Sequence, residues 1–179
     1  QAKKSYYRLM GSVEKQKFRY QWEKVIQGFS KVQAHFPNSS QAYKAVYTIA
    51  RLYEGLNKVS RNSKDLDQAL RYYEKVSQDY SPGTLTDDAL YESAEIYRDK
   101  KEFSSAAGIF KTIFEKYPRG DQAEKARQQY KKLASIPVRK KKEQVSQLSP
   151  ATKKPVVLGK KKKPEAVKHV KVSPPAKKK

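Results

Sequence analysis

The sequence has little of what catalytic and metal sites are commonly built from: no cysteine, two histidines and seven glycines in 179 residues. Without cysteine the chain forms no disulfide and binds no metal through thiolates. With only His35 and His169 it has neither the histidine-rich ligand set of a zinc hydrolase nor a Ser–His–Asp set. Its glycines form no phosphate-binding loop. We therefore expect no catalytic residue, no metal site and no cofactor, and we expect His35 to lie exposed on a helix.

Long apolar runs are also missing. No run approaches the roughly 18 residues that a membrane-spanning helix needs, so we expect no transmembrane segment. No signal peptide is present. Because the chain starts with Gln1 rather than Met, we interpret it as a processed protein or an excised fragment from which an export signal has been removed.

The charge and the apolar residues divide the chain into two parts. The chain has 40 Lys and Arg against 18 Asp and Glu, a net charge of +22. All Trp, Phe and Tyr lie in residues 1–137, whereas the stretch from Arg139 onward has 15 Lys and Arg and two Glu, a net charge of +13. Low hydrophobicity with high charge is typical of disorder. We predict a folded domain at 1–137 and a disordered Lys/Pro-rich tail or linker at 138–179.

Three hypotheses fit the tail: a solvated spacer, an electrostatic tether to an anionic envelope polymer or lipid, and a contact with nucleic acid. The tail has no aromatic side chain that would stack on bases, which makes nucleic acid the weakest of the three. The tether hypothesis places the contacts on two lysine clusters: Lys140, Lys141, Lys142, Lys160, Lys161, Lys162 and Lys163.

Within the folded part, three segments repeat one spacing of large apolar residues. They run from Trp22 to Phe36, from Leu66 to Tyr80 and from Phe103 to Tyr117. Steps of three and four residues place these side chains on one face of a helix. The second segment follows the first by 44 residues and the third follows the second by 37. The second and third segments are each preceded by a helical pattern of small and aromatic residues: Ala45, Ala50 and Tyr53, then Ala89, Ala94 and Tyr97.

This pattern resembles the tetratricopeptide repeat (TPR), a helix pair of about 34 residues with alanine, aromatic and proline at set positions. We predict an all-α, TPR-like right-handed α-solenoid of about seven antiparallel helices with no strands. Its units lie at about 5–39, 40–83 and 84–120, and a capping helix at 121–134 covers the last apolar face.

Smaller features complete the expected architecture. The 44-residue step implies a seven-residue insertion, which we place in a polar loop from Gly55 to Lys64 that is a surface excursion or a partner contact. Two capping boxes are expected, Asn38 with Gln41 and Asp121 with Glu124. A degenerate apolar pattern predicts one first helix that includes Tyr6, Leu9, Val13 and Phe18.

The repeat also separates core from surface. The row formed by Phe29, Tyr73 and Phe110 should be buried. A different set, on the exposed face of each first helix, should line a concave groove that takes a protein or peptide partner, because Tyr and Arg are enriched at binding hot spots. The alternative is a solvated face. The groove set is Lys44, Tyr47, Arg51 and Glu54 in the second unit and Asp88, Tyr91, Glu95 and Arg98 in the third.

The joints between units narrow the resemblance. The chain resembles bacterial cell-envelope TPR proteins at three joints: Pro37–Ala42, Thr86–Tyr91 and Tyr117–Ala123. Such proteins include the outer-membrane-assembly lipoprotein and the Tol–Pal-associated coordinator of peptidoglycan synthesis. Residues 5–134 look most like the N-terminal TPR region of exported N-acetylmuramoyl-L-alanine amidases. That resemblance implies a periplasmic or envelope location. It also implies that 138–179 is a linker toward a zinc amidase domain, with no catalytic residue on this chain.

These observations favour a non-catalytic interaction module, in its narrowest form the N-terminal arm of a peptidoglycan amidase. A free-standing envelope TPR scaffold is the first alternative, and a nucleic-acid-associated protein that uses the basic tail is the second.

Overall fold

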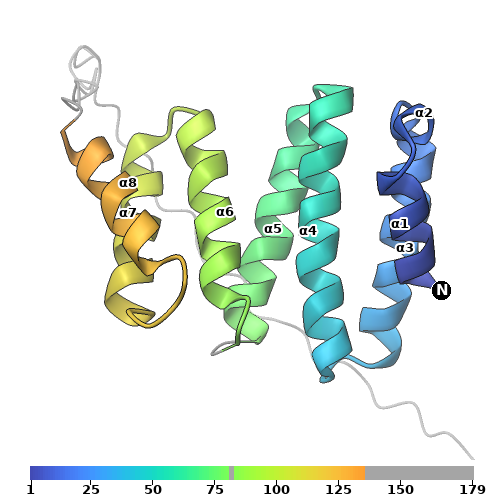
Figure 1. Ribbon diagram of the computed structural model, residues 1–179, viewed down its shortest axis with the longest axis horizontal. Coiled ribbons are helices and arrows are strands. Elements are labelled where there is room, and N and C mark those ends of the chain that lie inside the picture. The colour runs from blue at the N-terminus through green and yellow to red at the C-terminus, as the bar shows by residue number, and fades with distance from the viewer. Residues whose placement is uncertain (81–82, 136–179) are drawn as a thin grey trace, which may run out of the picture. The chain divides into compact units, whose positions relative to one another are not determined.

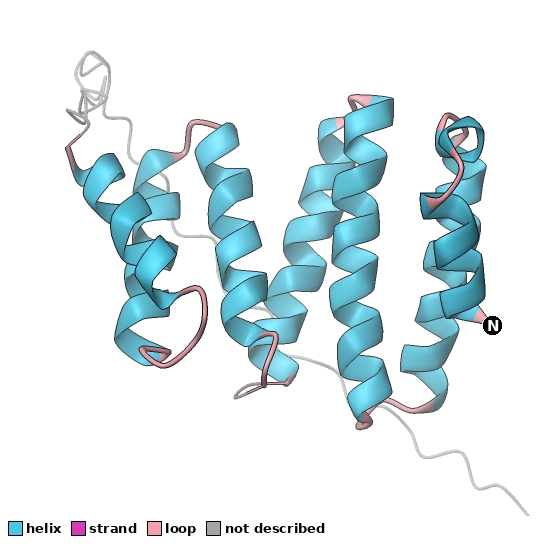
Figure 2. Cartoon of the chain, viewed as in Figure 1, coloured by secondary structure: helices cyan, strands magenta, loops and turns pink. Residues whose placement is uncertain are grey.

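The computed structural model describes residues 1–80 and 83–135, and the account below concerns these residues. They form eight α-helices and no strand (Figures 1 and 2). The predicted all-α fold is confirmed, with one helix more than expected within the described ranges. The helices are α1 (Ala2–Met10), α2 (Val13–Gln16), α3 (Arg19–His35), α4 (Ser40–Ser60), α5 (Ser63–Asp79), α6 (Thr86–Asp99), α7 (Phe103–Lys116) and α8 (Ala123–Ala134).

The helices pack in chain order. The pairs α4–α5 and α6–α7 form hairpins that stand side by side in Figure 1, and α8 follows them as a single helix. α3 packs against α4, α5 against α6, and α7 against α8. Each pair therefore contacts only its neighbours, which is the arrangement of a TPR-like solenoid.

The described residues form three core clusters: the first among α1, α3 and α4, the second among α4, α5 and α6, and the third among α6, α7 and α8. The predicted row is confirmed, since Phe29, Tyr73 and Phe110 are 7%, 1% and 0% exposed. Each such burial contributes roughly 1.5–3 kcal/mol. The small residues that let the helices approach are also buried: Ala45, Ala50, Ala89 and Ala94.

The polar loop predicted from Gly55 to Lys64 is wrong. α4 continues to Ser60 and α5 begins at Ser63, so the insertion lengthens the two helices of this hairpin. Leu56 explains the difference, because it is fully buried in the first core cluster and holds the last turns of α4 against it. Arg61, at φ 56° and ψ 20°, ends α4 in the left-handed conformation, and the Asn62 side chain caps α5 by accepting the N–H of Lys64.

The capping box predicted at Asn38 and Gln41 is also wrong. The N-cap of α4 is Ser39, whose Oγ accepts the backbone N–H of Ala42 at 3.0 Å. An N-cap side chain must lie next to the first helical residue to reach these amides. Asn38 lies one residue too early.

The second predicted capping box, Asp121 with Glu124, does not form. α8 begins at Ala123 and has no side-chain cap, so Asp121 lies one residue before the N-cap position. Its carboxylate instead accepts the side-chain Nε2 of Gln122 at 3.2 Å. The apolar face predicted for this last helix is confirmed, since Ala123, Ala126 and Leu133 are buried.

The N-terminal region contains two helices where one was expected. Gly11 follows α1, and Ser12 then caps the four-residue α2 by accepting the N–H of Lys15. Only Leu9 of the predicted apolar set is fully buried, whereas Val13 and Phe18 are exposed. Phe36, the last member of the first repeated segment, is exposed as well, because it lies beyond the end of α3.

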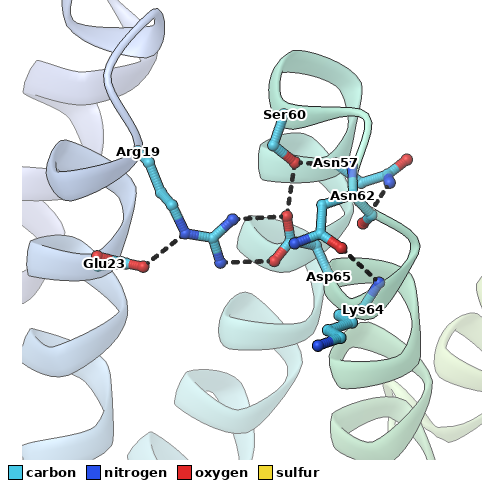
Figure 3. Close-up of polar contacts among 7 residues, drawn as sticks. All are labelled: Arg19, Glu23, Asn57, Ser60, Asn62, Lys64 and Asp65. Atoms are coloured by element: carbon cyan, nitrogen blue, oxygen red, sulfur yellow. Dashed lines mark hydrogen bonds and ion pairs between the residues drawn. The ribbon is translucent and has the colours of Figure 1, made fainter.

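An ion pair connects α3 to the start of α5 (Figure 3). The Arg19 guanidinium donates to both oxygens of Asp65, at 2.7 and 3.0 Å, and the Ser60 hydroxyl donates to the same carboxylate at 2.6 Å. Asp65 is 1% exposed. Burial alone would raise its pKa, but the bonds from Arg19 and Ser60 outweigh burial and hold the pKa of Asp65 below its ordinary value. The lengthened hairpin is thus held against the first unit by a charged contact.

Candidate partner-binding site

An apolar cavity opens between α1, α3 and α4. Its volume is about 350 Å³, and its walls include Tyr6 and Tyr7 of α1 and Phe29 of α3. The Tyr6 ring stands edge-on to Phe29, with centroids 6.2 Å apart. Three predicted groove residues, Lys44, Tyr47 and Arg51, line its α4 side. The cavity therefore offers aromatic walls beside three cationic side chains, those of Lys3, Lys44 and Arg51.

Two smaller cavities continue the hollow along α4. Arg51 borders a second cavity of about 180 Å³, together with Trp22, Glu54 and Lys58. Glu54 and Lys58 also border a third cavity of about 220 Å³. Because neighbouring cavities share these side chains, they form one groove that follows the face of α4 from Lys44 to Lys58.

The far end of this groove is acidic. Four carboxylates line the third cavity: Glu54 of α4 and Glu92, Glu95 and Asp99 of α6. Burial, and next the charge of Glu54, raise the pKa of Glu92. Burial likewise raises the pKa of Glu95, although the nearby Arg98 opposes it. Glu54 pairs with Lys58 at 3.2 Å, which offsets only part of this negative charge. The groove thus runs from a cationic, aromatic end to an acidic end.

Two tyrosines support the groove near its cationic end, Tyr47 in the cavity wall and Tyr73 buried beside it. The Tyr47 ring packs edge-on against Tyr73, with centroids 5.7 Å apart. Tyr73 in turn donates its hydroxyl to Glu54 Oε2 at 3.1 Å. Burial, followed by the charges of Asp88 and Glu92, raises the pKa of Tyr47. The raised pKa favours the protonated phenol further, and Tyr47 can act as a hydrogen-bond donor to a partner.

The predicted residues of α6 are only partly brought to this groove. Glu95 lines its acidic end, and Arg98 pairs with Glu95 at 2.7 Å. Tyr91 instead packs edge-on against Phe110, with centroids 5.4 Å apart. Asp88 accepts Gln122 Nε2 at 2.8 Å, toward α8. Tyr91 therefore lines none of the three cavities, whereas Asp88 bonds toward α8 but still lies near enough to Tyr47 for its charge to raise the pKa of that tyrosine.

The sequence analysis did not predict that Tyr6, Tyr7 and Glu92 line this groove. Glu92 carried a usable signal, because it follows Asp88 by four residues and precedes Glu95 by three, which places it on the same helix face. Tyr6 and Tyr7 carried none, since their position depends on how α1 docks on Phe29.

Three further predictions concerned His35, a membrane-spanning helix and the basic tail. His35 is exposed, as expected. No helix of the described residues combines the length and the apolar character that a bilayer crossing requires. The tail at 138–179, with the proposed tether residues Lys140, Lys141, Lys142, Lys160, Lys161, Lys162 and Lys163, lies outside the described residues.

Comparison with known proteins agrees with this architecture. Residues 88–120 match the family model described as a tetratricopeptide repeat, and they cover nearly all of α6, the whole of α7 and the turn that follows. Searches of curated proteins and of solved structures each found no match. The chain therefore carries a tetratricopeptide repeat, a protein–protein interaction module, within an all-α solenoid.

Proposed function

We propose that this chain binds an extended segment of a partner protein along α4. The observation that carries the proposal is the run of three cavities whose shared walls are Arg51, Glu54 and Lys58. The face from Lys44 to Lys58 rises about 20 Å along the helix. That length accommodates about six residues of extended peptide.

The two ends of the groove favour different side chains. An aromatic or branched apolar side chain suits the cavity beside Tyr6 and Phe29, and an acidic neighbour suits Lys44 and Arg51. A lysine or arginine suits the acidic end, which Glu92 and the other carboxylates line. Complementary charge at both ends would fix the direction of the bound peptide.

The only tryptophan, Trp22, borders the middle cavity and reports on binding directly. A six-residue peptide with an acidic and an aromatic residue at one end and two lysines at the other should shift the Trp22 fluorescence in a saturable way. Charge reversal in Arg51→Glu should weaken the affinity at least about tenfold.

Arg71→Glu supplies the matched control, because Arg71 is exposed on α5 away from these cavities and should leave the affinity unchanged. Equal binding of the peptide and of its charge-reversed version would contradict the proposal. So would an equal loss in both variants.

We further propose that the module belongs to the bacterial cell envelope as the non-catalytic N-terminal arm of an N-acetylmuramoyl-L-alanine amidase. The resemblance of residues 5–134 to that region and the Lys/Pro-rich composition of 138–179 support this context. A coding sequence that continues past Lys179 into a His- and Glu-bearing hydrolase domain would agree with it. A stop codon there would favour the free-standing scaffold, and recovery of the protein from the cytoplasm would contradict both.

The basic residues from Arg139 onward support a second contact, with an anionic envelope polymer or lipid. Their 15 positive side chains predict binding that weakens steeply with salt. Binding of the full chain to purified cell wall and to duplex DNA should be titrated over the same salt series. Tight wall binding with weak DNA binding is expected, and the reverse would support the nucleic-acid alternative. A chain that binds neither has a spacer in place of a tether.

A further inference from the structure

Three carboxylates gather where α6 meets the turn before α8. Asp87 and Asp88 lie in the first turn of α6, and Asp121 lies in the turn after α7. One oxygen of each lies within 4.8 Å of an oxygen of the other two. The residues come from positions 34 apart in the chain, so the cluster is produced by the packing of the third unit on the last helix.

Asp87 is enclosed in this cluster with an unused oxygen. The residue is 5% exposed, and its Oδ2 has no hydrogen-bond partner among the residues that the structure describes. Gly120 lies directly against it: a Cβ added there would lie 2.9 Å from the Asp87 Cγ and still closer to Oδ2. Burial, together with the charges of Asp88 and Asp121, raises the pKa of Asp87, although backbone amides of Asp87 and Gln122 favour its charged form. A buried carboxylate oxygen without a partner is costly unless a cation compensates it.

The described part of the chain supplies no such cation from its own side chains. Among the described residues, no Lys or Arg forms an ion pair with any of the three aspartates, in a chain of net charge +22. Within residues 1–80 and 83–135, the only side chain that donates to two of these carboxylates is Gln122, whose Nε2 lies 2.8 Å from Asp88 and 3.2 Å from Asp121. The two adjacent helix N-termini offer about half a positive charge each, which is less than three carboxylates require.

The equivalent joint one unit earlier, between α4 and the turn before α6, shows that the position of Asp87 does not need an acid. Tyr43 occupies in α4 the position that Asp87 occupies in α6, 44 residues later, and Gly83 precedes Gly120 by 37. The Tyr43 hydroxyl accepts the N–H of Leu85 and lies 3.5 Å from Thr86 Oγ1, so that joint is closed by neutral groups. At the second joint the neutral phenol is replaced by a carboxylate with two acidic neighbours.

We propose that Asp87, Asp88 and Asp121 bind a hard divalent cation, Ca²⁺ or Mg²⁺. Clustered carboxylate oxygens are the ligands that both ions prefer. Rotation of the Gln122 side-chain amide would turn its Oε1 toward the ion and add a neutral oxygen. The bound cation would link α6 to the start of α8 and so fix the helix that covers the third core cluster. This inference is independent of the proposed peptide groove.

The test is a titration of the full chain, stripped with a chelator, with CaCl2 and separately with MgCl2. NaCl at equal ionic strength serves as the blank, and both calorimetric heat and melting temperature are recorded. We expect saturable heat and a rise in the melting temperature with at least one of the two ions. The ion that gives the tighter binding identifies which cation the site takes.

Asp121→Asn is the informative variant, because Asp121 is exposed in a turn and its replacement should not disturb folding. The affinity should fall at least about tenfold. Asp87→Asn should abolish binding and leave the apo protein at least as stable as wild type. Glu124→Gln, an exposed acid in the first turn of α8, should bind like wild type. The absence of ion-specific heat at millimolar Ca²⁺ and Mg²⁺, or binding that survives both aspartate substitutions, would overturn the proposal.

Discussion

Replacement of Arg19 by alanine should destabilise the folded chain by about 2 kcal/mol. The change leaves the buried Asp65 carboxylate with the Ser60 hydroxyl as its remaining side-chain partner. Removal of one partner of a fully buried pair costs roughly 3–5 kcal/mol. The Arg19 side chain is 44% exposed, however, so solvent screens the interaction and the lower range of about 1.5–3 kcal/mol for a charged hydrogen bond applies.

Thermal or urea unfolding measures this effect, and a folded region of this size should lose about 6–10 °C in melting temperature. Glu23→Gln is the matched control, because Glu23 also pairs with Arg19 at 2.7 Å but is exposed. That change should cost less than about 1 kcal/mol. If Arg19→Ala were no more destabilising than Glu23→Gln, the buried contact between α3 and α5 would contribute nothing and the reasoning would be refuted.

The same pair predicts a pH dependence. The pKa of Asp65 is lower in the folded chain than in the unfolded chain, so folding favours its ionised form. Its contribution to stability is present above the unfolded pKa of about 3.9 and is lost as the pH falls through the folded value. Asp65→Asn should therefore destabilise at pH 7, and the difference from wild type should shrink in acid. A difference that stays constant down to pH 3 would show that this carboxylate has an ordinary pKa.

Two further pairs of substitutions test the packing. Gly108→Ala should stabilise the chain by about 0.5–1 kcal/mol, because Gly108 is exposed on α7 and nothing lies within 4 Å of the added Cβ. Gly83→Ala should destabilise it by about 1–3 kcal/mol, because the new Cβ would overlap the Tyr43 ring, and denaturant unfolding compares the two. Ala94→Arg should abolish the cooperative melt, since this fully buried position has no space for a long side chain. Tyr91→Ala should keep the helical circular dichroism and leave peptide affinity nearly unchanged; a large loss of affinity would place Tyr91 in the binding site after all.

The repeat itself could be predicted from the sequence because its signal is local. Steps of three and four apolar residues define helix faces, and the residues that they selected, such as Tyr73 and Phe110, are buried as expected. The helix boundaries were harder to predict than the helix faces. Gly55, Asn57 and Asn62 carry turn propensity, yet α4 continues through the first two, since Leu56 is buried and Gly55 leaves room for the Trp22 ring beneath it. Tertiary packing overrides local propensity here.

The candidate site was predictable only where it lies on one helix. Lys44, Tyr47 and Arg51 share a face of α4 by spacing alone, and the structure places them together in one cavity. The tyrosines of α1 reach the same cavity through the docking of a separate helix, which no pattern in their own segment specifies. Asp87 and Asp121 likewise meet through the packing of the third unit on the last helix, so the acidic cluster has no signature along the chain.

The first helix of each hairpin packs in two cores, which affects how cooperatively the chain unfolds. α4 supplies Ile49 and Leu52 to the first core cluster and Val46 and Ala50 to the second, so its two sides belong to different cores. Damage to α4 therefore removes the packing of both units at once, and neither can unfold while the other stays intact. Beyond α6 the coupling is weaker, because Ala94 is the one fully buried α6 side chain in the third cluster. α7 and α8 can thus open as a separate cooperative block while α6 stays packed in the second core cluster.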